Sequence, residues 1–222
     1  RWESKEGAEL MFRKLLMSGV ALTVLAMSLM LFTGQYGEAA EKQTIYWIGK
    51  TLNNPWWIMV KDIAVREAAE LGVEITANLP EEEVDLELQV MMIEAAIQKQ
   101  ANAIVISAIN SQGVIPSLER AKQAGITVIN FDTRIADPGL ARAFVGADDV
   151  AGAYKAGKYI CQKLQGKGEV ALLEGLLEQS TGVDRKAGFL NAIKECPEIK
   201  VVASVSAAWR TDLARDATAN IL

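Results

Sequence analysis

Apolar and polar stretches alternate along the chain from Thr44 onward. One strand and one helix recur about every 25–30 residues, which is the spacing of right-handed βαβ units. Short apolar runs predict strands at residues 44–49, 73–77, 103–106, 127–131, 143–145, 169–173 and 199–205. Longer amphipathic stretches predict helices at residues 55–71, 85–100, 150–164, 183–196 and 211–222, and one more that ends at Ala124. The pattern therefore predicts an α/β fold with doubly wound parallel sheets.

Two of the predicted helices show a distinct apolar side. The helix at 55–71 carries Trp56, Met59, Val60, Ile63 and Leu71 along one side, and the helix at 85–100 is expected to bury Val90, Met91, Ile93, Ala96 and Ile97. The acidic run at residues 81–85 is interpreted as a solvated loop and a helix start, because acidic residues favour helix N-termini. Asn110 or Ser111 is expected to cap the helix that ends at Ala124.

The most informative stretch is TIYWIGKTLNNPWW, residues 44–57. A buried strand ends at Gly49 in a polar loop. Pro55 then stands where a first helical position is expected, since its fixed φ and missing N–H suit that place. In an open α/β sheet, ligands bind at the carboxyl ends of the strands. Of the adjacent Trp56 and Trp57, one can pack inward while the other offers a flat apolar face to a ligand.

Polar and aromatic side chains also follow three later strands, at residues 132–134, 178–185 and 209. Because parallel strands present their carboxyl ends at the same edge, these side chains are expected to converge there with the 54–57 loop. Carboxylate, amide and guanidinium groups bind hydroxyls, and indole rings cover the C–H face of a pyranose or furanose. The candidate ligand-binding residues are Asn54, Trp56, Trp57, Asp132, Arg134, Arg185 and Trp209.

These positions also have simpler interpretations, which the sequence leaves open. Asp132 could simply cap a turn, and Trp209 could be a core residue. Arg134 and the loop residue Lys50 could be solvated surface charges. Arg185 could form a surface ion pair with Asp184 or Glu178.

The first 39 residues are interpreted as ten upstream residues followed by an export signal that starts at Met11. Met11 has the features of a start residue, Arg13 and Lys14 form a basic segment, and residues 15–32 are continuously apolar. Gly37 and Ala39 are the small residues at −3 and −1 that suit cleavage after Ala39. The alternative is an uncleaved membrane anchor, because about 18 apolar residues is the lower limit for spanning a bilayer. We expect cleavage, and a mature protein in the periplasm.

Composition narrows the possible functions. Half of the 222 residues are apolar and the net charge is −5, which is a globular composition and argues against a nucleic-acid partner. The absence of histidine removes Ser-His-Asp and Cys-His catalysis. The two cysteines, Cys161 and Cys196, are too few for a Cys₄ metal site. We interpret them as core residues or free thiols. A disulfide between them depends on the distance between their Cα atoms, which the sequence does not give. The chain lacks a complete P-loop, a GxGxxG and a GxSxG motif, so we expect no cofactor, no metal and no enzymatic activity.

Four motifs in order carry a family resemblance: TLNNPWW, VINFDTR, VGADDVAGAYKAG and DRKAGF. Together they resemble the periplasmic sugar-binding proteins of the ribose-binding type (periplasmic binding protein type 1), which share their fold with the ligand core of the lactose-repressor family. The resemblance covers residues 44–222. It implies two Rossmann-like lobes, at residues 40–147 and 148–222, that close on a sugar. Two lobes of about 130 residues each would be longer than the chain after residue 39, so we expect the second lobe to be incomplete.

By motif, the family's site residues fall on Asn54, Trp56, Trp57, Asp132 and Trp209 of this sequence. The chain departs from the ribose pattern in three ways. Thr133 comes between Asp132 and Arg134; the second-lobe arginine falls on Val183, which leaves Arg185 as the nearest candidate; and Lys50 replaces a small hydroxyl residue. A sugar or polyol other than ribose is therefore expected.

The resemblance implies a monomeric binding protein that delivers its sugar to an ABC transporter permease, and in some members also docks on a chemoreceptor. A periplasmic sensor is one alternative function. The ligand core of a lactose-repressor-like regulator is another, although an apolar export segment stands where such a regulator carries its DNA-binding helices. An α/β enzyme is the third.

Overall fold

The structure is a computed structural model that describes residues 43–222, which form one compact unit. The predicted export signal at residues 1–39 lies outside the described residues. Within the described part of the chain, no helix combines the length and the apolar character that a membrane span requires.

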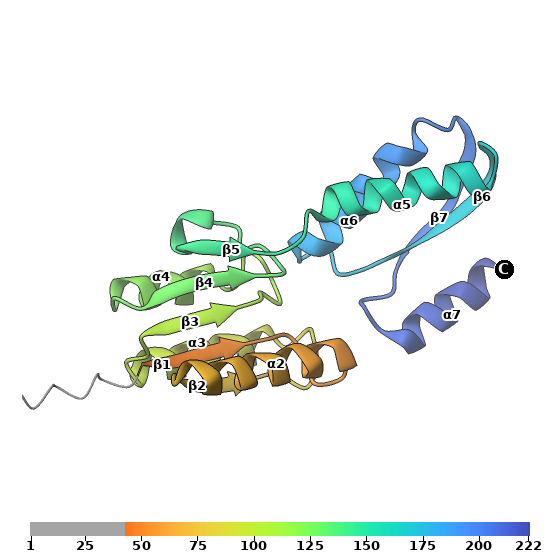
Figure 1. Cartoon of the computed structure of the whole chain (residues 1–222). Helices are drawn as coiled ribbons and strands as arrows, with labels where there is room; N and C mark the ends of the chain where they lie inside the picture. Colours follow the sequence, from red (N-terminus) through yellow and green to blue (C-terminus); the bar gives the residue numbers. More distant parts are fainter. Residues whose placement is uncertain (1–42) are drawn as a thin grey trace, which may run out of the picture. The chain divides into compact units, whose positions relative to one another are not determined.

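Five of the strands in residues 43–222 form a parallel sheet, as the apolar runs predict (Figure 1). These strands are β1 (Thr44–Ile48), β2 (Glu74–Asn78), β3 (Ala103–Ile106), β4 (Thr127–Phe131) and β5 (Ala143–Val145). Their order is β2-β1-β3-β4-β5. In the register, Ile48 pairs with Asn78 on one side and with Ile106 on the other. The loops that follow β1, β2 and β3 therefore begin at the same level of one sheet edge.

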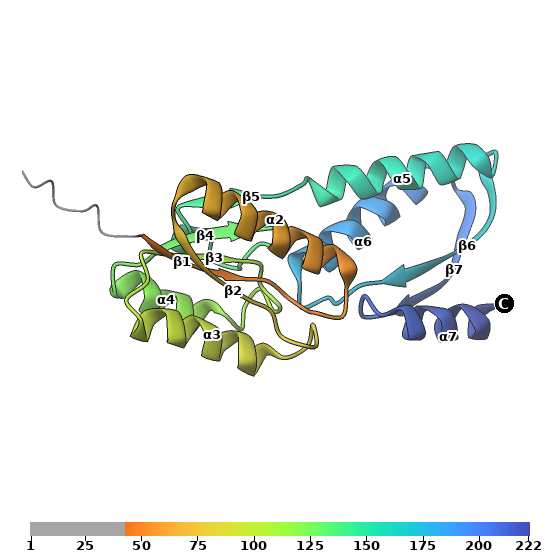
Figure 2. The ribbon, with the colours of Figure 1, turned by 60° about the horizontal axis from the view of Figure 1, so that its bottom comes forward.

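Helices cover both faces of this sheet. They are α2 (Pro55–Leu71), α3 (Leu86–Gln98) and α4 (Ile115–Gln123). Figure 2 shows α2 on one face and α3 with α4 on the opposite face. The core beneath α3 and α4 is mainly aliphatic and includes Ile48, Ile104 and Ile106, which are fully buried. The core beneath α2 is largely aromatic, with Trp47 and Trp57 buried around Leu79. Packing on both faces explains why the inner strands β1, β3 and β4 read as nearly continuous apolar runs, whereas the edge strands β2 and β5 are more exposed.

The apolar side predicted for α2 is wrong for most of its residues. Trp56, Met59, Ile63 and Leu71 are 45%, 51%, 41% and 77% exposed. The helix instead packs Trp57, Val60 and Ala64 against the aromatic core. Val60 and Ala64 follow Trp57 by three and seven residues, so the three side chains lie on one side of the helix. That side is rotated from the predicted one. Similarly, Met91 of α3 is exposed, whereas the polar Gln89 is fully buried.

Local capping follows the sequence in part. Asp85 begins α3 by accepting a hydrogen bond from the Leu88 N–H at 3.0 Å, as expected for an acidic helix start. Asn110 does not cap α4, which has Val114 at its N-cap. Its Oδ1 accepts instead from the Gln112 and Gly113 N–H groups in the preceding turn.

Two further strands pair in parallel in the second part of the described chain. They are β6 (Lys167–Glu174) and β7 (Glu198–Ser206), and the helices around them are α5 (Asp149–Lys163), α6 (Ser180–Ile193) and α7 (Thr211–Ile221). Helices α5 and α6 pack together on one side of β6 and β7, and α7 lies on the other side (Figures 1 and 2). Asp148 caps α5 by accepting from the Ala151 N–H at 2.9 Å. The lobe boundary at residues 147 and 148 stays a prediction.

The two cysteines are buried core residues, as expected, but they are not free thiols. Cys161 on α5 and Cys196 after α6 form a disulfide, with Cα atoms 6.3 Å apart. The bond lies among Phe189, Ile193 and Ile199, so it joins the two helices at their buried contact. Sequence reasoning lacked the distance between these two Cα atoms.

Reduction of this disulfide is expected to lower the free energy of unfolding by about 3–4 kcal/mol, because the bond closes a long loop in the unfolded chain. The two cysteines are 35 residues apart. Urea unfolding with and without dithiothreitol measures the effect. The double variant Cys161→Ala/Cys196→Ala is the control and should not respond to the reductant. An equal midpoint for the wild type in both conditions would contradict the prediction.

Candidate functional site

The loops after β1, β2, β4 and β7, together with helices α2 and α6, contribute to one cavity of about 330 Å³. That volume lies within the range of small-molecule sites. Six of the seven residues predicted from sequence line it. The cavity is lined by Asn54, Trp56, Trp57, Asp132, Arg185 and Trp209, together with Lys50, Glu83 and Thr181.

Asn54 is fixed by the start of α2. Its Oδ1 accepts a hydrogen bond from the Trp56 N–H at 3.0 Å, which makes it the N-cap of the helix. Pro55 follows at the first helical position, as its fixed φ predicts. The side-chain oxygen of Asn54 is therefore used by the helix, and its Nδ2 amino group is available as a donor to a ligand.

The two adjacent tryptophans have different surroundings, as the sequence predicts. Trp57 is 3% exposed and packs near Trp47 and Phe131, with ring centroids 6.5 and 5.9 Å away. Trp56 is 45% exposed and meets Trp57 edge-on at 4.7 Å. The buried ring holds the exposed ring at the edge of the cavity.

Asp132 directly follows β4 and has a φ of 56°, which non-glycine residues rarely adopt. Its Oδ2 accepts from the hydroxyls of Ser107 and Thr133, each at 3.0 Å, and lies 3.3 Å from Lys50 Nζ. Within residues 43–222, the side-chain contacts of Asp132 all go to Oδ2. Its Oδ1 is therefore left as an acceptor for a ligand.

Lys50 is buried rather than solvated, with 2% of its surface exposed. Its Nζ donates to Thr133 Oγ1 and to Gln179 Oε1, the latter at 2.9 Å, and lies 3.5 Å from Glu83 Oε1. Burial lowers the pKa of the Lys50 ammonium, and the neighbouring Asp132 and Glu83 oppose that shift. The ammonium thus joins two carboxylates beside the cavity.

Glu83 corrects the interpretation of the acidic run at residues 81–85. Its neighbours Glu81 and Glu82 are exposed, but the Glu83 side chain is only 11% exposed and points toward Lys50. Burial raises the pKa of the Glu83 carboxyl above its ordinary value of 4.5, and the nearby Lys50 opposes that shift. Glu83 is therefore a carboxylate of the cavity.

The raised pKa of Glu83 predicts a pH dependence of stability. Above pH 4.5 the unfolded chain releases this proton while the folded protein still holds it. The free energy of unfolding of the wild type should therefore fall, relative to Glu83→Gln, as pH rises from 4.5 through the folded pKa. Below that window the two proteins should differ by a constant amount. Urea unfolding of both proteins across the window measures the effect, and a difference that does not change with pH would contradict it.

Buried amides hold the loops around the cavity. Gln89 Nε2 donates to the carbonyls of Gly49 and Ser107 at 3.1 and 2.9 Å, and its Oε1 accepts from the Ile109 N–H at 2.8 Å. Asn130 Nδ2 donates to the carbonyls of Ile106 and Thr133. These bonds tie the loops after β1, β3 and β4 together. Sequence reasoning missed both roles because an amide on a helix or strand carries no sign of its partner.

Arg185 and Trp209 complete the cavity from the second part of the described chain. Arg185 Nε donates to Asp149 Oδ1 at 2.7 Å, so its partner is neither Asp184 nor Glu178. The guanidinium carbon lies 5.4 Å from the Trp209 ring centroid. Within the described residues, the hydrogen bonds of this guanidinium use only Nε, which leaves its two Nη groups as donors.

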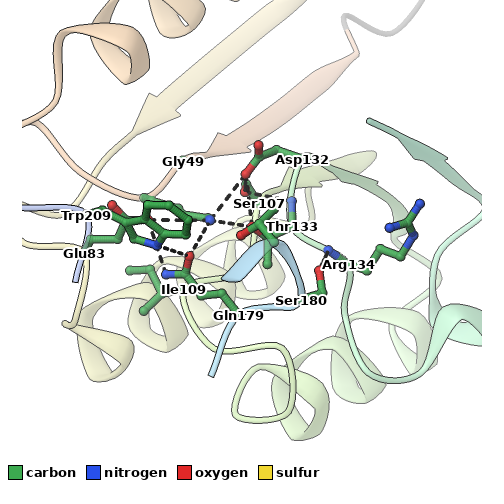
Figure 3. Close-up of polar contacts among 12 residues, drawn as sticks. Gly49, Glu83, Ser107, Ile109, Asp132, Thr133, Arg134, Gln179, Ser180 and Trp209 are labelled. Carbon is green, nitrogen blue, oxygen red and sulfur yellow. Dashed lines mark hydrogen bonds and ion pairs between the residues drawn. The ribbon is translucent and has the colours of Figure 1, made fainter. Parts of the chain in front are cut away.

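Arg134 lies apart from this cavity and is not among the described residues that line it. Its guanidinium stacks on Phe144 at 4.3 Å and pairs with Asp184 at 3.4 Å, and its backbone N–H donates to Ser180 Oγ at 2.7 Å. Figure 3 shows its side chain directed away from Asp132 and Trp209. The intervening Thr133 takes the buried place beside Lys50, which turns the next side chain outward.

The cavity combines three aromatic rings with both charged and amide groups. It offers a carboxylate oxygen, a guanidinium and an amide as hydrogen-bonding groups, and indole faces as apolar surface. Such a set suits a small ligand that carries several hydroxyls on one side and C–H groups on the other.

Comparison with known proteins agrees with this architecture. A family model described as "Periplasmic binding protein domain" matches residues 45–222. The D-allose-binding periplasmic protein of Escherichia coli is 33% identical over 87% of this chain and 63% of its own length. The D-ribose/D-allose-binding protein of Pseudomonas aeruginosa is 30% identical over 89% of this chain and 63% of its own length.

A solved structure agrees as well. A periplasmic solute-binding protein of an ABC transporter from Actinobacillus succinogenes, with bound D-allose, has a TM-score of 0.75 and 34% identity, covering 82% of this chain and 65% of that chain. The present chain thus spans about 63% of the length of the first two relatives. It belongs to the periplasmic binding protein domain family, type 1, and resembles the ribose- and allose-binding members.

Proposed function

We propose that this protein is a periplasmic solute-binding protein that captures a monosaccharide or polyol and delivers it to an ABC importer. One observation carries the proposal: indole rings and a carboxylate from separate βα units line a single cavity. The relatives support the class of ligand, since the names of two of them include ribose or allose.

The binding residues of the proposal each have a distinct part. Asp132 Oδ1 accepts from sugar hydroxyls, and Asn54 Nδ2 and the Arg185 Nη groups donate to them. Hydrogen bonds to charged groups contribute about 1.5–3 kcal/mol each. Trp56, Trp57 and Trp209 cover the apolar C–H faces of the ring, which excludes water from those bonds. Arg134 has no part in binding.

D-Allose is the first candidate ligand. The relatives at 33% and 34% identity are an allose-binding protein and a protein solved with bound D-allose. The departures of this chain from the ribose pattern, at Lys50, Thr133 and Val183, favour a sugar other than ribose.

The remaining parts of the proposal concern location and partners. Export through a cleaved signal at residues 1–39 would place the protein in the periplasm, where a permease receives the sugar and a chemoreceptor is a further partner. Residues 40–147 and 148–222 are proposed as the two lobes, and the protein as a monomer that carries out no chemical reaction on the sugar.

A thermal-shift screen tests the function directly. The purified protein is heated with pentoses, hexoses including D-allose, and inositols. Because a ligand that binds only the folded state stabilises it, at least one sugar should raise the melting temperature in a concentration-dependent way. Calorimetry on the best sugar then gives the affinity. A screen without any shift, followed by no heat of binding for D-allose or D-ribose, would contradict the proposal.

A further inference from the structure

Gln179 lies behind the sugar cavity and has no exposed surface. It occupies the N-cap position of α6, but its side chain makes no capping hydrogen bond. The side-chain amide of Gln179 instead forms hydrogen bonds with three other side chains. Its Oε1 accepts from Lys50 Nζ and from Trp209 Nε1, both at 2.9 Å, and its Nε2 donates to Glu83 Oε1 at 3.2 Å (Figure 3).

The three partners of Gln179 come from three loops that are distant in sequence. Lys50 follows β1, Glu83 follows β2 and Trp209 follows β7. All three line the cavity, whereas Gln179 is not among the described residues that do so. One buried amide therefore contacts three cavity residues without lining the cavity itself.

Trp209 depends on such support because its backbone is in an uncommon conformation. Its φ is 60° and that of Ala208 is 48°, values that residues other than glycine rarely adopt. The indole lies so close to Gly175 that a Cβ on that glycine would fall 2.0 Å from the ring. The hydrogen bond from Trp209 Nε1 to Gln179 then restricts the rotation of the indole in the narrow space beside Gly175.

We propose that Gln179 is a positioning residue of the sugar site, which holds Lys50, Glu83 and Trp209 in the places from which they line the cavity. The inference rests on the proposed sugar-binding function. It states that sugar affinity depends on an amide that the sugar does not touch.

Two substitutions separate this role from simple loss of packing. Gln179→Leu keeps the volume and removes all three bonds. Gln179→Glu keeps an acceptor for Lys50 and Trp209, but at neutral pH it loses the donor to Glu83 and adds a negative charge. The charged groups around position 179 are Lys50, Glu83 and, through Thr133, Asp132, with Arg185 on the Trp209 ring. A proton on either the new carboxyl or Glu83 restores a hydrogen bond between them and removes the added charge.

The experiment measures sugar affinity by calorimetry at about pH 8 and about pH 5, with the best sugar from the thermal-shift screen. Gln179→Leu should bind at least tenfold more weakly at both pH values. Gln179→Glu should bind weakly at the higher pH and recover toward wild type at the lower pH. Gln162→Leu, an exposed glutamine on α5, should bind as wild type does.

A second measurement does not need the sugar. The indole N–H signal of Trp209 in an NMR spectrum, identified by its loss in Trp209→Phe, should shift and exchange faster with water in Gln179→Leu. If the signal responds but the wild type binds no sugar, the proposed function fails while the positioning of Trp209 stands. If the wild type binds sugar and the Gln179 variants match it in affinity and pH dependence, the inference alone is overturned.

Discussion

Asp132→Asn is expected to weaken sugar binding at least tenfold. Oδ2 of this residue already accepts from Ser107 and Thr133 and lies beside Lys50, so the single oxygen of asparagine would stay with these donors. The amino group would then face the sugar where the wild type offers a charged acceptor. The loss of one charge-assisted hydrogen bond costs about 1.5–3 kcal/mol, and about 1.4 kcal/mol corresponds to a tenfold change in affinity.

Asparagine is preferred to alanine at this position because it tolerates the positive φ of residue 132. Calorimetry with the best sugar from the screen measures the effect. Asp137→Asn is a matched control, since Asp137 accepts from the Gly139 N–H and lies outside the lining of the cavity among the described residues. An affinity for Asp132→Asn within twofold of wild type would remove Asp132 from the site.

Lys50→Met is expected to lower the free energy of unfolding by about 3–5 kcal/mol, which is the cost of leaving a buried charge without its partner. Methionine fills a similar volume, so the loss arises from the charges. Without the ammonium, Asp132 and Glu83 face each other across a region where Lys50 had been 2% exposed. The site should lose its arrangement together with its stability.

Lys61→Met is the matched control for Lys50→Met. Lys61 is on α2, its side chain is 30% exposed, and it pairs with the exposed Asp62 at 3.4 Å, so its loss should cost at most about 1 kcal/mol. Adding Glu83→Gln to Lys50→Met should recover part of the stability, because it neutralises one of the two carboxylates. Urea unfolding of the four proteins measures these differences. Equal losses for Lys50→Met and Lys61→Met would show that the Lys50 charge is solvated after all.

The order of strands and helices could be predicted from the apolar pattern because the inner strands β1, β3 and β4 of the parallel sheet are packed on both faces. The position of Asp132 and Trp209 at strand ends followed from the same pattern. The pattern did not show which stripe of α2 is buried, because apolar residues such as Trp56 and Met59 surround much of that helix. Only the packing of Trp57 against Trp47 decides between the two stripes.

The buried charged and amide residues in and behind the cavity lining could not be predicted. Lys50 and Glu83 lie in polar loops, and the sequence of such a loop does not distinguish a charge that is buried in an ion pair from one that is solvated. The hydrogen-bond partners of Gln179 are 30 to 129 positions away in the sequence. Those of Gln89 are 18 to 40 positions away. The outward turn of Arg134 depends on the burial of Thr133, and the Cys161–Cys196 bond depends on how α5 and α6 pack.

A crystal structure of the protein grown with its best sugar tests the central claim most directly. The account predicts one sugar ring in the cavity, with a hydroxyl hydrogen-bonded to Asp132 Oδ1 and an indole of Trp56, Trp57 or Trp209 against its C–H face. A sugar bound at another place, or one that occupies the cavity without contact to Asp132 and to these rings, would contradict it.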